Sequence, residues 1–280
     1  MEFVCVFDWL SKPYCPVDPS AKDWIERHLK WLTRQFPSNI FTDRPLVVPT
    51  EEFFPEPLAP SEEAAKALFA RICRLMEVPE DRVSLKFEKE DPAPILMWDG
   101  SRRPLLLVNN DGDYVPSQPA GTYSSSWRKH VVTLTTSQIY HPGDLVPTMA
   151  HELAHARVRG ERRIRPDRFD EELLTDLTTC FLGFAIFMAN SPRVWKSQFT
   201  KWPGTQFNKP EYMSPPMFGY VLGHLAWHQG ERKPSWKRYL GPGVIGDFKD
   251  ATRYLFKTED SSFQPSWLRA VTCRRGEVYS

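Results

Sequence analysis

The sequence has 280 residues, with 36 Lys and Arg against 35 Asp and Glu, which gives a formal net charge of +1. This balance argues against a protein that binds nucleic acid through a general positive field. Hydrophobic residues make up 41% of the chain and charged residues 25%, the proportions of a globular protein. We expect no membrane span, because no apolar run reaches the roughly 18–20 residues that a span needs.

The N-terminus and the cysteines bear on cellular location. Residues 1–15 carry Glu2 and no basic residue before their short apolar run, which is untypical of a signal peptide. The five cysteines include no C-x-x-C pair. We therefore expect neither a disulfide framework nor a zinc ribbon, and the features together predict a cytoplasmic protein.

Apolar residues at helical spacing, with capping and stop signals, predict most of the chain to be helical. Ser61 and Asp170 are the expected N-caps of two of these helices. The predicted helices span 19–36, 61–77, 144–158, 171–189, 215–229 and 245–257.

Between the second and third predicted helices the pattern changes to short strands separated by Pro, Gly, Asn and Asp. The predicted strands are 83–90, 93–98, 103–108 and 130–138. The run NNDGD at 109–113 predicts a hairpin turn, since it lacks the alternating acidic order of a calcium loop. Residues 200–214 are expected to form a long surface loop.

These elements predict an α+β fold with a small twisted sheet packed on helices. A helical, Pro-rich region at 1–80 is expected to pack on a core at 81–280. One continuous domain remains an alternative to that division.

Residues 151–155 read His-Glu-Leu-Ala-His, an H-E-x-x-H motif. On a helix, positions i and i+4 share a face, so His151 and His155 can both turn an imidazole toward one metal ion. Glu152 lies about 100° round the helix from His151. That position suits a general base acting on a metal-bound water.

A catalytic zinc ion usually has three protein ligands and one open position. The region that follows offers Asp170, Glu171, Glu172 and Asp176. Of these, Glu172 and Asp176 are again four residues apart and share a face of the next helix. We assign Glu172 as the third ligand. Asp176 is expected to accept a hydrogen bond from a zinc-binding histidine and to fix its tautomer.

The HELAH motif, followed 17 residues after His155 by Glu172-x-x-x-Asp176, resembles the gluzincin branch of zinc metallopeptidases, the thermolysin-like group. The resemblance covers about 130–190. It implies a zincin-like fold, one Zn²⁺ per chain held by His151, His155 and Glu172, Glu152 as the base and Asp176 as support. The metzincin extension is absent, since 158 is Val and 161 is Glu, and no G-x-M-E-N exopeptidase signature occurs.

The expected activity is hydrolysis of peptide bonds by a zinc-activated water, with Glu152 passing the proton to the leaving amine. The extended run 130–138 is expected to be an edge strand that pairs with the backbone of a peptide or protein substrate. Candidate donors to the oxyanion lie downstream. They are Tyr212, Tyr220 and His224.

Three alternatives remain open at the level of sequence. HELAH could be a chance pattern on a core helix, the zinc could hold together a non-catalytic binding or regulatory protein, or the substrate could be a non-peptide amide. His224 and His228 form another i, i+4 pair, for which packing on Trp227 is favoured over a second metal site.

Other features have a plain interpretation beside a functional one. The basic run 157–168 has a net charge of +4, which suits either a solvated loop or contact with acidic substrates or a phosphate-bearing partner. Cys180 is interpreted as core filler and not as a nucleophile. Trp202 and Trp236 fall in loop-like contexts and could line a pocket.

Overall fold

The structure is a computed structural model that describes residues 13–268, with internal gaps. The gaps are 57–58, 90–93, 97–101, 105–106, 109–113, 116–120, 127–128, 141, 166–167, 192–199, 202–207 and 210–211. The fold is mostly helical α+β, as predicted. The chain forms two compact units, one from Met1–Phe53 with Phe169–Ser280 and one from Phe54–Arg168. These units are groups of residues that contact one another closely and do not test the predicted division into 1–80 and 81–280, which stays a prediction.

The unit Phe54–Arg168 contains the main sheet. Helix α2 (Glu62–Leu75) begins at Ser61, whose side chain accepts a hydrogen bond from the Ala64 amide at 3.1 Å and so confirms the predicted cap. The sheet has the order β1-β7-β6, with β1 (Val83–Glu88) parallel and β6 (Gly121–Ser126) antiparallel to β7 (Lys129–Thr135). Val132 and Leu134 of β7 are fully buried, so one face of the sheet is covered.

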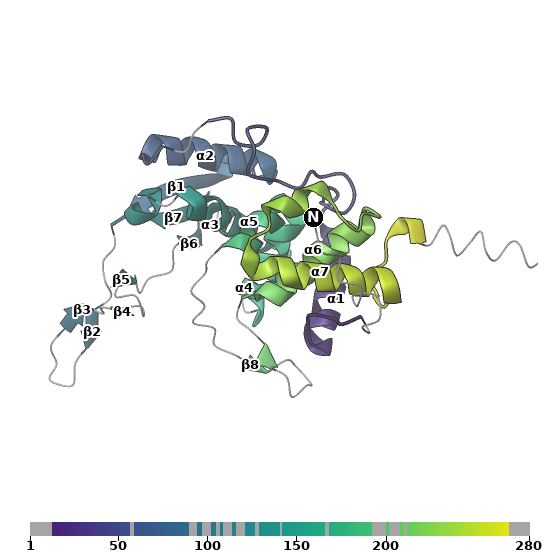
Figure 1. Ribbon diagram of the computed structural model, residues 1–280. Coiled ribbons are helices and arrows are strands. Elements are labelled where there is room, and N and C mark those ends of the chain that lie inside the picture. The colour runs from purple at the N-terminus through teal and green to yellow at the C-terminus, as the bar shows by residue number, and fades with distance from the viewer. Residues whose placement is uncertain are drawn as a thin grey trace, which may run out of the picture. The chain divides into compact units, whose positions relative to one another are not determined.

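The sheet corrects one prediction. The run 130–138 was expected to be an edge strand, but β7 lies in the centre with a partner on each side (Figure 1). A strand buried between two neighbours has no free backbone groups for a substrate. In the described part of the chain, β6 and β1 are the edges of this sheet, and residues 136–140 form a 3₁₀ turn (η2, Thr136–Tyr140).

Two short antiparallel pairs complete the strands of this unit. Strand β2 (Pro94–Leu96) pairs with β3 (Arg102–Pro104), and β4 (Leu107–Val108) pairs with β5 (Tyr114–Val115). The predicted turn at 109–113 lies outside the described residues. The strands on either side of it pair antiparallel, as a hairpin requires.

Helix α3 (Pro142–His155) packs on α2 and on strands β6 and β7, and it continues into a π-helix, η3 (Ala156–Gly160). The buried residues of α3 recur at helical spacing, which explains why this segment is a core helix. They include Leu145, Val146, Met149, Ala150, Leu153 and Ala154.

The other unit is built around α6 (Pro215–His228), a helix buried on all sides. It packs against α1 (Pro19–Gln35), α5 (Ala185–Asn190) and α7 (Pro242–Thr258), and α6 and α7 run side by side (Figure 1). A helix that is apolar round its whole circumference belongs in a core. A short strand pair, β8 (Thr200–Lys201) with β9 (Asn208–Lys209), lies where a loop was expected at 200–214, most of which is outside the described residues.

The segment predicted as one helix at 171–189 is interrupted. It consists of α4 (Glu171–Thr179), a π-helix η4 (Cys180–Phe184) and α5. Gly183 has φ of 110°, a conformation that glycine adopts without strain. Carbonyl groups near the break accept hydrogen bonds from a segment that follows α1. The Ile40 amide donates to the Phe181 carbonyl, and the Val47 amide donates to the Gly183 carbonyl. The predicted helix is therefore interrupted where a distant segment of the chain bonds to its backbone.

By length and composition, Glu171–Asn190 is long and apolar enough to cross a membrane, whereas the sequence led us to expect no such segment. However, 83% of its most apolar window is buried inside the structure. The core helix of a folded domain meets the same criterion, so the finding is weak support for a span.

Candidate metal centre

Helix α3 carries the three polar residues of the motif into a buried setting. His151, Glu152 and His155 are only 4%, 6% and 6% exposed. The two imidazole rings lie edge to face with their centroids 4.9 Å apart, as the i, i+4 spacing predicts. Two histidines and a carboxylate are costly to bury among apolar residues unless they are paired or bind a metal.

Helix α4 carries the two predicted carboxylates. Glu172 is half-buried and Asp176 is fully buried. Oδ2 of Asp176 accepts a hydrogen bond from the backbone amide of Met213 at 2.9 Å, which ties the segment before α6 to the middle of α4. The expected contact of Asp176 with a zinc-binding histidine stays a prediction.

The structure brings the three predicted ligands together. One ligand atom from each of His151, His155 and Glu172 lies within 4.8 Å of the other two. Ligand atoms on a tetrahedral zinc ion, at about 2.0–2.1 Å from the metal, are about 3.4 Å apart. The donor set of two imidazoles and one carboxylate fits a zinc ion with an open fourth position.

Both helices that bear predicted ligands change to π-helix within four residues of their last site residue. Helix α3 does so after His155, and α4 does so three residues after Asp176. A π-turn inserts an extra residue into the helical repeat, and such turns occur frequently at functional sites. They change the direction in which the following residues point.

The three candidate oxyanion donors have different surroundings. Tyr212 is half-buried and precedes Met213, which is hydrogen-bonded to Asp176. The Tyr220 hydroxyl donates to the Glu26 carboxylate at 2.8 Å, so its proton is already engaged. The oxyanion role stays a prediction for all three, and Tyr212 adjoins a residue that is hydrogen-bonded to Asp176.

His224 is fully buried, and neither of its ring nitrogens has a hydrogen-bond partner among the described residues. Its ring packs against Tyr220 and Trp227. His228 stacks on Phe263 at 4.4 Å between centroids. Within the described residues only the His151, His155 and Glu172 group has metal-ligand spacing, and the His224–His228 pair takes part in aromatic packing.

A buried carboxylate that the sequence analysis missed lies on α1. Glu26 is 2% exposed and accepts hydrogen bonds from Tyr220 and from the amide and hydroxyl of Ser262, both at 2.7 Å, with Lys22 at 3.2 Å. Burial alone would raise the pKa of Glu26, but the hydrogen bonds from Ser262 and Tyr220 and the charge of Lys22 lower it overall. In the sequence, Glu26 could have been recognised from its i, i+4 spacing to Lys22 at the edge of the apolar face of this helix.

The remaining candidates have structural surroundings. In the basic run, Arg157 donates to the Glu77 carbonyl at 2.6 Å and Arg163 pairs with Glu161 at 2.7 Å. Cys180 is buried, as expected of core filler. Trp236 donates to the Gln229 side chain at 3.2 Å, whereas Trp202 lies outside the described residues.

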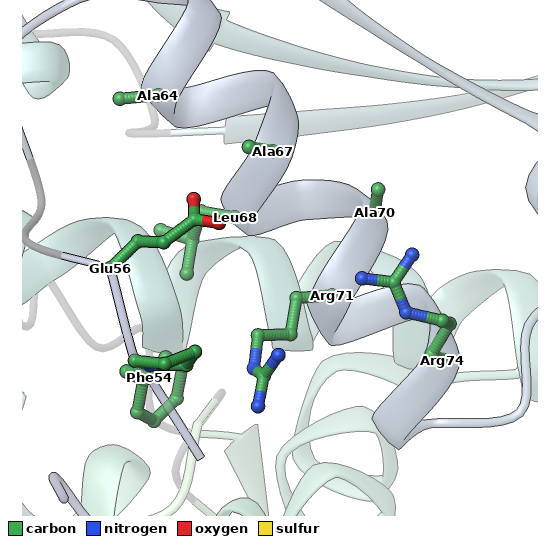
Figure 2. Close-up of a pocket in the computed structure, with 9 residues that line it drawn as sticks. Phe54, Glu56, Ala64, Ala67, Leu68, Ala70, Arg71 and Arg74 are labelled. Carbon is green, nitrogen blue, oxygen red and sulfur yellow. The ribbon is translucent and has the colours of Figure 1, made fainter. Parts of the chain in front are cut away.

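A hollow of about 280 Å³ lies on α2, away from the motif in sequence. It is lined by Phe54, Pro55, Glu56 and one side of α2, and Figure 2 shows Arg71 and Arg74 leaving the helix at one end of it. None of the predicted site residues lines it.

Comparison with known proteins gives no relative. No family model matches the sequence, and neither the curated proteins nor the solved structures compared with it give a match. The structure therefore shows a buried His151, His155 and Glu172 group on helices, consistent with an H-E-x-x-H type of site that could bind a metal ion.

Proposed function

We propose that the protein is a zinc-dependent metallopeptidase with a zincin-like core. The observation that carries the proposal is the convergence of His151, His155 and Glu172, with the Glu152 carboxylate next to the first ligand. A zinc ion held there would supply Lewis-acid chemistry, lowering the pKa of a bound water to about 7 and polarising a carbonyl oxygen.

The residues of the chain divide the remaining work. Glu152 supplies a carboxylate oxygen that accepts a proton from the attacking water and later returns it to the leaving amine. Burial excludes bulk water from this carboxylate and strengthens its interactions with charge at the reacting centre. Asp176, fixed by the Met213 amide, orients a histidine ligand.

The substrate class is a peptide or protein, and the oxyanion is stabilised by Tyr212 in this proposal. We also propose a cytoplasmic location. Cys15 and Cys73 are free thiols, which fits a reducing compartment.

The test compares wild type with Glu152→Gln on broad peptide libraries. The amide keeps the size of the side chain but cannot accept the proton, so turnover should fall by about 10²–10⁴-fold while zinc stays bound. Retained turnover in Glu152→Gln would refute the role of Glu152. A wild type that binds zinc and cleaves no peptide or other amide would instead support a zinc-dependent binding protein.

A further inference from the structure

Asp170 occupies the N-cap position of α4, two residues before Glu172. Its side chain makes no capping hydrogen bond to its own helix, contrary to the prediction from sequence. It is 2% exposed, so its carboxylate lies in the interior of the unit that contains α1 and α4. A buried carboxylate needs hydrogen-bond donors from elsewhere in the fold.

Helix α1 supplies a donor. The indole Nε1 of Trp24 lies 2.8 Å from Oδ2 of Asp170, and both residues are buried. The indole N–H is a donor only, and hydrogen bonds to a carboxylate are among the stronger ones in proteins. The bond joins residues 146 positions apart in the chain.

His28 contacts Trp24 through a hydrogen bond to its backbone and through a ring contact with its indole. Its Nδ1 lies 2.7 Å from the Trp24 carbonyl oxygen, which can only accept, so Nδ1 carries the proton. The centroids of the Trp24 and His28 rings lie 4.2 Å apart. The Nε2 atom of His28 is 3.9 Å from Asp170 Oδ2, the oxygen that accepts from the indole. The indole therefore has its ring face packed and its N–H aimed at one acceptor.

We propose that Trp24 is a positioning residue for the metal site and acts on Glu172 through Asp170. The cap residue sets where α4 begins, and the Asp170 carbonyl accepts from the Leu174 amide at 3.0 Å in the first turn. Glu172 lies within that turn. Fixing Asp170 to α1 therefore fixes the backbone from which the third ligand projects.

The consequence is a metal affinity that depends on a residue outside the ligand set. Groups that orient metal ligands typically contribute about 10–100-fold to affinity. Trp24→Phe keeps the ring and removes only the N–H, so we expect zinc to bind about 10-fold more weakly. This inference rests on the proposed zinc site.

The test is a double-mutant cycle on the full chain, with zinc dissociation constants measured by chelator competition for wild type, Trp24→Phe, Asp170→Ala and the double variant. If Trp24 acts through Asp170, the double variant binds zinc no more weakly than Asp170→Ala alone. Cobalt(II) visible spectra of the same proteins report ligand geometry, which a merely structural role would leave unchanged.

Ser262→Ala is the matched control, because it removes a 2.7 Å hydrogen bond to Glu26, another buried carboxylate on α1. It should lower the melting temperature of the zinc-free protein as Trp24→Phe does but leave zinc affinity unchanged. Equal zinc affinity in wild type and Trp24→Phe, or additive losses in the double variant, would overturn the inference alone. A wild type that binds no zinc would overturn the proposed function with it.

Discussion

The contact between α6 and α7 gives a prediction whose sign and size follow from distances. Gly219 of α6 lies against α7 so closely that an added Cβ would be 2.5 Å from the Asp247 Cβ and 2.8 Å from the Phe248 nitrogen. Ordinary contacts between carbon atoms are about 3.5–4.0 Å. The obstructing atoms belong to or adjoin the backbone of α7, so they cannot rotate away.

Gly219→Ala should therefore force the two helices apart by about 1 Å. Overpacking of this kind lowers the free energy of unfolding by about 1–3 kcal/mol. Because the backbone of α7 cannot move aside, we expect Gly219→Ala to lie near the upper end of that range. Alanine regains about 1 kcal/mol of helix propensity. The net loss is about 2 kcal/mol, which corresponds to a melting temperature lower by about 4–8 °C in a chain of this size.

Gly246 is the matched control, since it lies within α7 with nothing within 4 Å of an added Cβ. Gly246→Ala should stabilise the protein by about 0.5–1 kcal/mol. Both variants are measured by thermal unfolding followed by circular dichroism. A Gly219→Ala protein as stable as wild type would refute the packing argument.

His224, Cys73 and Gly183 are buried, and a change at each has a measurable consequence. Burial, together with the nearby charges of His228 and Lys22, lowers the pKa of His224, so the unfolded chain takes up a proton near pH 6.5 that the folded protein does not. The free energy of unfolding should therefore fall by about 1 kcal/mol from pH 6.5 to 5.5. Urea titrations of His224→Gln should lack that loss. Burial, with a smaller contribution from Glu80, raises the pKa of Cys73 to about 12, so iodoacetamide at pH 8 followed by peptide mapping should modify Cys15 before Cys73. Gly183→Ala should lower the free energy of unfolding by about 1–3 kcal/mol, because the φ of 110° at this position is strained for alanine. The added Cβ would also lie 3.1 Å from the Pro45 carbonyl oxygen. An unchanged midpoint of urea unfolding would contradict this prediction.

The helices were predictable because their periodicity is local. Trp24, Ile25 and Leu29 recur at the spacing that buries one helix face, and the structure has α1 at Pro19–Gln35 against a predicted 19–36. The candidate site was predictable for the same reason, since i, i+4 pairs within α3 and within α4 fix which side chains share a face.

The features that the sequence did not reveal depend on contacts between distant segments. At the break near Gly183, residues 40 and 47 donate hydrogen bonds to the backbone of residues 181 and 183. The central position of β7 depends on its pairing with β1. Asp170 was expected to cap its own helix. The Trp24 indole competes for the same carboxylate, which no local rule could indicate.

The assignment of a zinc site to His151, His155 and Glu172 underlies the proposed function. It is tested most directly by the zinc content of wild type and Glu172→Ala, purified without added metal and measured by mass spectrometry. We expect about one zinc ion per wild-type chain and a sharp loss in the variant. No zinc in wild type, even after reconstitution, would show that these residues do not form a zinc site and that HELAH is a coincidence on a core helix.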